Sequence, residues 1–181
     1  MSKKLITGTL FIVGLCLIAS VLFAPTTLVP VSDTTEVGVE IHVDMWHYRD
    51  DVLLQHSHHP GVLTTLGANW IEDQMGDTPA TDPAKWIAVS NNSSTPAAAW
   101  IVIPNEITTG NMGRAAGTYA STGDGEWTIT KTFSPSGSGS CQLTGLYWAA
   151  TGDFLLCADT FTAINFENGD SIEIQWSMTV S

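Results

Sequence analysis

The sequence has few basic residues. Lysine and arginine together number 6 in 181 residues, against 18 aspartates and glutamates, and the formal net charge at pH 7 is −12. Nucleic-acid binding depends on clusters of Lys and Arg that neutralise phosphates. After Lys3 and Lys4 the chain has no such cluster. This charge balance argues against nucleic-acid partners and against docking of the acidic part on anionic lipid head groups.

The sequence also lacks the motifs that mark common active sites. It has no nucleophile elbow, no phosphate loop and no dinucleotide-binding fingerprint. No histidine belongs to a recognisable Ser–His or Cys–His catalytic motif, and nothing singles out two of the 18 acidic residues as a catalytic pair. We therefore expect a protein that is not an enzyme and that needs no organic cofactor.

Cysteine is scarce too, with three residues in the chain. Cys16 lies in an apolar segment, whereas Cys141 and Cys157 lie in the acidic part. An oxidising compartment would favour a disulfide between these two. A tight hairpin at residues 151–153 would instead set them out of register. The sequence leaves both outcomes open, a Cys141–Cys157 disulfide or two buried free thiols.

Charged residues are absent from residues 5–24, which follow Lys3 and Lys4. A helix of this length rises about 30 Å, enough to cross the hydrocarbon core of a bilayer. A basic start before an apolar run is also typical of a secretory signal peptide, although Leu22 and Pro25 make a poor cleavage site. Residues 1–24 are thus predicted to be a signal anchor or a cleaved signal peptide. The remainder would be extracytoplasmic, membrane-anchored or secreted.

Residues 25–36 are rich in Pro, Thr and Val and predict an extended linker. Residues 37–181 are long enough to fold as one domain. Most of this domain reads as strands, because apolar residues alternate with polar ones between turn signals. The expected strands are Val37–Arg49, Val52–His58, Lys85–Ser90, Ala98–Ile103, Arg114–Ser121, Glu126–Phe133, Gln142–Ala149, Phe154–Thr160 and Ser171–Val180.

One segment, residues 61–76, has a helical period instead. Thr64 or Thr65 can cap its start and Gly76 can close its end. Strands and turns at this spacing predict a two-sheet antiparallel β-sandwich, jelly-roll or immunoglobulin-like, with one short embedded helix.

Several stretches resemble structural modules of tailed-phage virions, of the tail-fibre or tail-associated kind. They are "GANWIEDQMG", "KWIAVSN", "WTITKTF", "GLYWAA" and "GDSIEIQW", in that order over about residues 61–180. The resemblance implies a structural β-sandwich in an assembly and carries no functional residue with it. The apolar N-terminus departs from the virion pattern and favours an envelope-anchored relative.

Histidines gather near the first two expected strands, three of them in "QHSHHPG" at residues 55–61. With a three-residue loop at 49–51, His42 would face His58 and Asp44 would face His56. These four side chains would then share one face of the sheet, as a ligand set for zinc or another divalent ion. A two-residue loop would send them to different faces. The alternatives are a solvated strand end or a pH-sensitive contact.

Asn91 and Asn92 each begin an Asn-Xaa-Ser sequon in the turn "SNNSSTP". The sequons predict glycosylation in an exported chain, and the alternative is an ordinary turn.

We expect a structural or interaction protein that builds or decorates an extracellular or virion-like assembly, through self-association or contact with other surface or virion proteins. A free strand at Val37–Met45 could pair with a neighbour. The alternatives are a glycan-binding module with Trp46 and Tyr48 as an exposed platform, or a metal-binding envelope domain that uses the histidine face.

Overall fold

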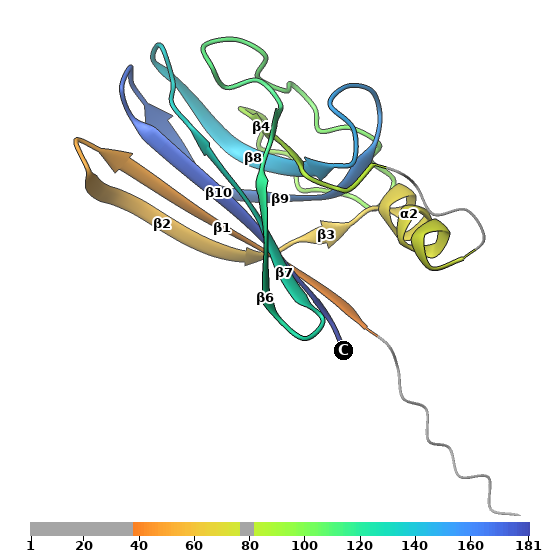
Figure 1. Cartoon of the computed structure of the whole chain (residues 1–181). Helices are drawn as coiled ribbons and strands as arrows, with labels where there is room; N and C mark the ends of the chain where they lie inside the picture. The colour runs from red at the N-terminus through yellow and green to blue at the C-terminus, as the bar shows by residue number, and fades with distance from the viewer. Residues whose placement is uncertain (1–37, 77–81) are drawn as a thin grey trace, which may run out of the picture. The chain divides into compact units, whose positions relative to one another are not determined.

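Two five-stranded antiparallel sheets make up the domain (Figure 1). The computed structural model describes residues 38–76 and 82–181, so the predicted signal segment (residues 1–24) and linker (25–36) lie outside the described residues. Sheet A has the strand order β2-β1-β10-β7-β6, and sheet B the order β3-β9-β8-β4-β5. The elements are β1 (Val39–Arg49), β2 (Val52–Pro60), β3 (Val62–Leu63), α2 (Thr65–Met75), β4 (Trp86–Ser90), β5 (Ala115–Ala116), β6 (Thr118–Gly123), β7 (Glu126–Phe133), β8 (Gly139–Tyr147), β9 (Leu155–Phe166) and β10 (Ser171–Val180).

The main core lies between the two sheets. Sheet A contributes side chains such as Val43 and Trp176, and sheet B contributes Ile87, Leu156 and Ile164, each at most 2% exposed. Strands β1 and β10 alternate buried and half-buried residues along most of their length, which confirms the period-2 pattern read from the sequence. The prediction of a β-sandwich with one short helix is therefore confirmed at this level.

Helix α2 begins where the sequence predicts. Thr64 is its N-cap, and the Thr64 hydroxyl accepts a hydrogen bond from the Gly67 backbone N–H at 2.8 Å. The same hydroxyl donates to the backbone oxygen of Leu155 at 2.6 Å, so the cap also ties the helix to β9. Gly76 closes the C-terminal end. The helix is peripheral rather than embedded, because among its residues only Gly67 is buried (Figure 1).

The prediction of a strand at Ala98–Ile103 is wrong, because this stretch is turns and irregular backbone. It belongs to a long connection over the outer face of sheet B, where Ile103 packs against Tyr147 and Leu155 in a second apolar cluster. The Ile103 N–H donates to the Tyr147 hydroxyl at 2.8 Å, a partner that a strand would not need. The apolar run at residues 98–103 therefore reflects packing against a sheet rather than membership of one.

Arg114 holds this connection in place. Its guanidinium carbon lies 3.5 Å from the centre of the Tyr147 ring, and its nitrogens donate to both Glu106 carboxylate oxygens at 3.1 and 2.6 Å. Further hydrogen bonds reach the backbone oxygens of Ala149 and Gly152. One of the few basic residues of the domain therefore has a structural role.

Candidate functional site

The β1–β2 hairpin sets the position of the histidines through two irregularities. Its turn has two residues, Asp50 and Asp51, both with left-handed backbone (φ 49° and 62°). A register shift follows: Tyr48 pairs with Leu53, but His47 pairs with Gln55. Of the two loop lengths considered from the sequence, the structure therefore has the two-residue loop and not the three-residue loop at 49–51. Relative to a three-residue loop, the short turn shifts the β1–β2 pairing by one residue, and the extra β2 residue shifts it by one more. The total shift of two residues leaves each side chain on the same face of the sheet as the three-residue loop would.

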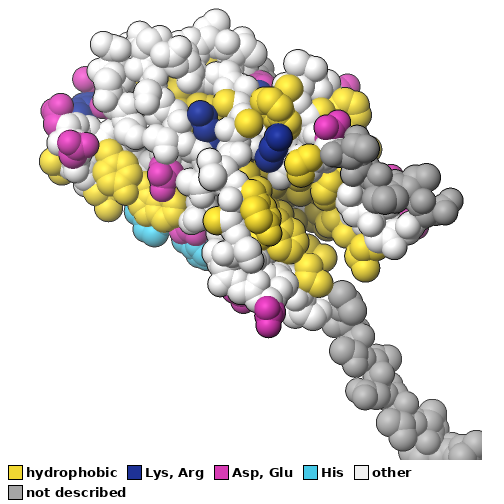
Figure 2. All heavy atoms as spheres, viewed as in Figure 1, with side chains coloured by type: hydrophobic (Ala, Val, Ile, Leu, Met, Phe, Trp, Pro, Cys, Tyr) yellow, Lys and Arg dark blue, Asp and Glu magenta, His cyan; other side chains and the backbone are white. Residues whose placement is uncertain are grey.

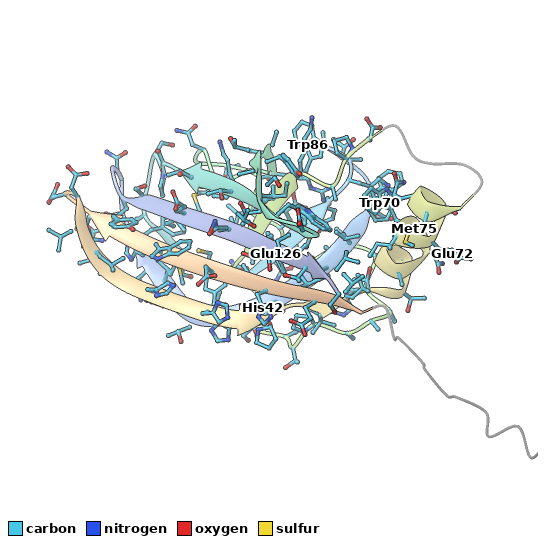
Figure 3. The ribbon with its side chains drawn as sticks, turned by 60° about the horizontal axis from the view of Figure 1, so that its bottom comes forward. His42, Trp70, Glu72, Met75, Trp86 and Glu126 are labelled. Carbon is cyan, nitrogen blue, oxygen red and sulfur yellow. The ribbon has the colours of Figure 1, made fainter. Side chains whose placement is uncertain are left out.

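The outer face of sheet A does carry His42, Asp44, His56 and His58 together, with the β1–β2 pairing shifted by two residues from the register of a three-residue loop. Asp44 pairs with His58 and not with His56. His56 Nε2 donates to Asp44 Oδ1 at 2.9 Å, and His58 Nδ1 donates to Asp44 Oδ2 at 3.0 Å. The rings of His42 and His58 stack with their centres 5.1 Å apart. Figure 3 shows His42 on the outside of the sheet, away from the core.

The side chains on this face form a hydrogen-bonded ladder, and a metal site made by His42, Asp44, His56 and His58 stays a prediction. Both carboxylate oxygens of Asp44 already accept from histidines, and His42 stacks beside them instead of converging on a common centre. Within residues 38–76 and 82–181, no three His, Cys, Asp or Glu side chains are arranged to hold a metal ion. The rings of Trp46 and His56 stack with their centres 5.0 Å apart and their planes 5° apart. One face of the Trp46 ring is therefore covered, whereas a glycan platform needs an open ring face.

A buried ionic cluster at the other end of β1 was not predicted. Asp170, 2% exposed, accepts from His47 Nε2 at 2.8 Å and from Arg49 Nε and Nη2 at 2.8 and 2.9 Å. The Glu167 backbone N–H donates to the same carboxylate at 2.8 Å. The pKa of Asp170 lies well below its usual range, mainly because the Arg49 guanidinium donates hydrogen bonds to the carboxylate. Burial raises this pKa, but its effect is smaller than that of Arg49, and the hydrogen bond from His47 lowers the pKa further. The sequence shows Asp170 as one residue of a turn, "ENGD". Only the pairing of the first strand with the last reveals its partners.

An apolar cavity lies where the two sheets separate beside α2. It has a volume of about 490 Å³. Figure 2 shows hydrophobic side chains gathered in a hollow between the β6–β7 hairpin and the helix. Figure 3 shows Trp70 on the side of the helix that faces the sandwich and Glu72 on the opposite side. The lining comes from both sheets and from the helix, and includes Ile41, Trp70, Ile71, Trp127, Ile129, Leu156 and Met178.

Comparisons with family models, curated proteins and solved structures found no match. The resemblance to tailed-phage modules therefore stays a prediction. In the part of the chain that the structure describes, no helix is long and apolar enough to cross a membrane. Residues 5–24 lie outside that part.

Cys141 and Cys157 are both free and fully buried, so of the two outcomes that the sequence left open the structure has two buried free thiols and not the disulfide. They occupy adjacent strands, but Cys141 pairs with Ile164 and Cys157 pairs with Leu146. The hairpin register therefore sets them well apart along the ladder. Burial raises the pKa of Cys141 to about 12 and raises that of Cys157 as well.

Both thiols should be unreactive in the folded protein, because the thiolate is the reactive form and burial disfavours it. We expect a chain of residues 33–181 to react with a colorimetric disulfide reagent at pH 8 only after unfolding in urea. Ser138→Cys, at an exposed position, is the matched control and should react at once. A reducing agent that lowered the unfolding midpoint would contradict the assignment of free thiols.

Asn91 and Asn92 lie in a structured turn after β4. The Asn92 side-chain oxygen accepts from the Ser94 N–H at 2.8 Å, and the Asn91 backbone oxygen accepts from the Gln142 side chain at 2.9 Å. The Asn91 side chain is exposed and that of Asn92 is half-buried. Glycosylation of either residue stays a prediction, and Asn91 is the more accessible of the two.

Proposed function

We propose that this chain is a non-enzymatic structural or interaction protein, held at a membrane by its N-terminal segment or secreted, and that its domain self-associates through an edge of sheet A. The observation that supports self-association most directly is that β6 is an exposed edge strand of sheet A. All six of its residues are exposed, with Tyr119 at 62%, and among the described strands its only partner is β7. We also propose the jelly-roll or immunoglobulin-like subclass and the phage-module relationship, which the sequence pattern supports.

The proposed edge differs from the one expected from the sequence. Val37–Met45 falls largely in β1, which pairs with β2 on one side and β10 on the other and so has no free edge. Strand β6 has one. Its sequence, "TYASTG", has neither a charge nor a proline, and these are devices that protect an edge from pairing.

The opposite edge of sheet A is better protected. Strand β2 carries a register shift next to Leu54 and ends at Pro60, and the Gln55 side chain donates to the Thr162 backbone oxygen of β9 at 2.9 Å. These features disfavour strand addition at β2. We therefore expect two copies to pair through β6, which makes a closed two-fold dimer with one continuous sheet.

Light scattering on residues 33–181 tests this proposal. The described strands pair only with one another within residues 38–181, so this part carries its own sheets and core. We expect a reversible dimer whose fraction rises with concentration, because a six-residue edge is short. Ala120→Lys should give a monomer, because pairing would bring the new charges of the two copies close together.

Leu54→Lys is the matched control, with the same charge added to an exposed position on the β2 edge. It should leave the dimer intact. A wild-type monomer at every concentration would overturn the proposal, and loss of the dimer in Leu54→Lys alone would move the interface to β2.

A further inference from the structure

We propose that the cavity beside α2 binds the hydrocarbon chain of a single-chain fatty acid, with the Lys85 ammonium group pairing with its carboxylate. This activity goes beyond self-association and does not depend on it. Three observations carry it: the chemistry of the lining, the size of the cavity and the one charged residue at its border.

The lining is almost wholly apolar. Its polar side-chain groups are confined to Gln74, Lys85, Tyr119 and the indoles of Trp70 and Trp127. A peptide would bring backbone N–H and C=O groups into the cavity, and each would need a hydrogen-bond partner that these walls largely lack. A hydrocarbon chain brings no such groups. The lining therefore favours an alkyl chain over a peptide segment.

The size of the cavity fits one such chain. A methylene group fills roughly the ~30 Å³ that a water molecule occupies in the liquid. The cavity volume of about 490 Å³ thus corresponds to about 16 carbon atoms. It also lies within the roughly 300–1,000 Å³ range of ligand pockets in proteins.

The positive charge of Lys85 at the cavity border favours a ligand with a carboxylate group. Lys85 is the one basic residue among the described lining residues, which include no Asp or Glu although the protein is strongly acidic. Arg49 and Arg114 form ion pairs with Asp170 and Glu106. The Lys85 amino group lies 5.9 Å from the centre of the Trp86 ring and makes no ion pair within the described residues. A carboxylate at the cavity border that pairs with Lys85 would therefore displace no ion pair made by the described residues.

Chain length should control the affinity. Each buried methylene contributes a factor of about four. An eight-carbon acid would fill half of the cavity, and the loss of eight buried methylenes should weaken binding by a factor on the order of 10⁴–10⁵ relative to a 16-carbon acid. A 16-carbon alcohol, which lacks the carboxylate, should bind about threefold to fivefold more weakly than the acid, the range of a partly exposed ion pair.

Photo-crosslinking on the full chain tests the proposal. The full chain, held in lipid nanodiscs, is irradiated with a 16-carbon fatty acid that carries a diazirine at its far end, and the labelled peptides are mapped by mass spectrometry. We expect labels on cavity residues such as Trp70, Ile129 and Met178, suppressed by excess 16-carbon acid and not by the eight-carbon acid. Labels confined to residues 5–24, or labels that no fatty acid suppresses, would overturn it.

Three variants separate the parts of the proposal. Lys85→Met keeps the aliphatic stem and should raise the concentration for half-maximal labelling about threefold to fivefold. Ile71→Trp, at a half-buried lining position, should abolish cavity labelling. Asn69→Trp adds the same side chain at an exposed position of α2 and is the matched control that should label like wild type. Equal labelling in Ile71→Trp and Asn69→Trp would show that the chain binds elsewhere.

Discussion

Gly67→Ala should destabilise the domain strongly, although alanine is normally the better helix former by about 1 kcal/mol. A Cβ atom at Gly67 would lie 2.1 Å from the Leu156 backbone oxygen and 2.8 Å from its carbonyl carbon. Both atoms belong to β9, an inner strand of sheet B that pairs with β3 and β8, and cannot move without disturbing that sheet. The helix would have to withdraw instead, weakening the Thr64 cap. We expect a loss of about 2–3 kcal/mol in the free energy of unfolding, as for other overpacked sites.

Urea unfolding followed by tryptophan fluorescence measures this loss. Ala68→Gly is the matched control, since it makes the reverse exchange at the next residue, which is exposed. It should cost about 1 kcal/mol through helix propensity alone. If Gly67→Ala were neutral or stabilising, the close contact between α2 and β9 would not exist in solution.

Asp170→Asn should remove most of the stabilisation from the buried ionic cluster and change how stability depends on pH. The substitution leaves His47 and Arg49 without their carboxylate while keeping its shape. Breaking a buried pair typically costs 3–5 kcal/mol. Because the Arg49 side chain is 36% exposed, solvent screening reduces this cost, and we expect a smaller loss of about 2–3 kcal/mol in the free energy of unfolding.

The pH dependence follows from the direction of the Asp170 pKa. This pKa is lowered in the folded protein, so the carboxylate stabilises the fold fully above the ordinary Asp pKa of about 3.9. That contribution is lost as the pH falls from there through the lowered value. Between about pH 4 and pH 2, wild-type stability should therefore fall more steeply than that of Asp170→Asn.

Urea unfolding at a series of pH values checks both effects. Asp124→Asn, which removes an exposed carboxylate from the β6–β7 turn, is the matched control for the change in net charge. It should follow the wild-type curve. Parallel pH profiles for wild type and Asp170→Asn would contradict the role given to Arg49 and His47.

Local patterns predicted the elements that depend on local chemistry. The alternation in β1 and β10 and the Thr64 cap needed only period and propensity. The histidine face needed the register, which depends on the left-handed backbone of Asp50 and Asp51 and on the extra residue in β2. Those two features each displace the pairing by one, and neither is visible in an apolar period.

Features made by distant segments could not be predicted in this way. Residues 98–103 are an apolar run like a buried strand, yet they form a covering layer, because Trp100, Val102 and Ile103 pack against the apolar outer surface of sheet B without strand geometry. Predicting the Asp170 cluster would require knowing that β1 pairs with β10. Predicting the cavity would require knowing where the two sheets separate. The order of the strands within each sheet is determined by interactions along the whole chain, so it cannot be predicted from a short segment of sequence.

The pairing of β1 with β10 also bears on how the domain forms. Tyr48 pairs with Ser171 and Val39 with Val180, and Gly38 and Ser181 exchange two backbone hydrogen bonds at 2.9 and 3.1 Å. Until residues near 180 have been synthesised, β1 can pair with β2 alone and its other edge stays open. Such long loop closures slow folding and prolong the exposure of unpaired strands. The nascent domain thus has an aggregation-prone interval that ends only when its final strand completes sheet A.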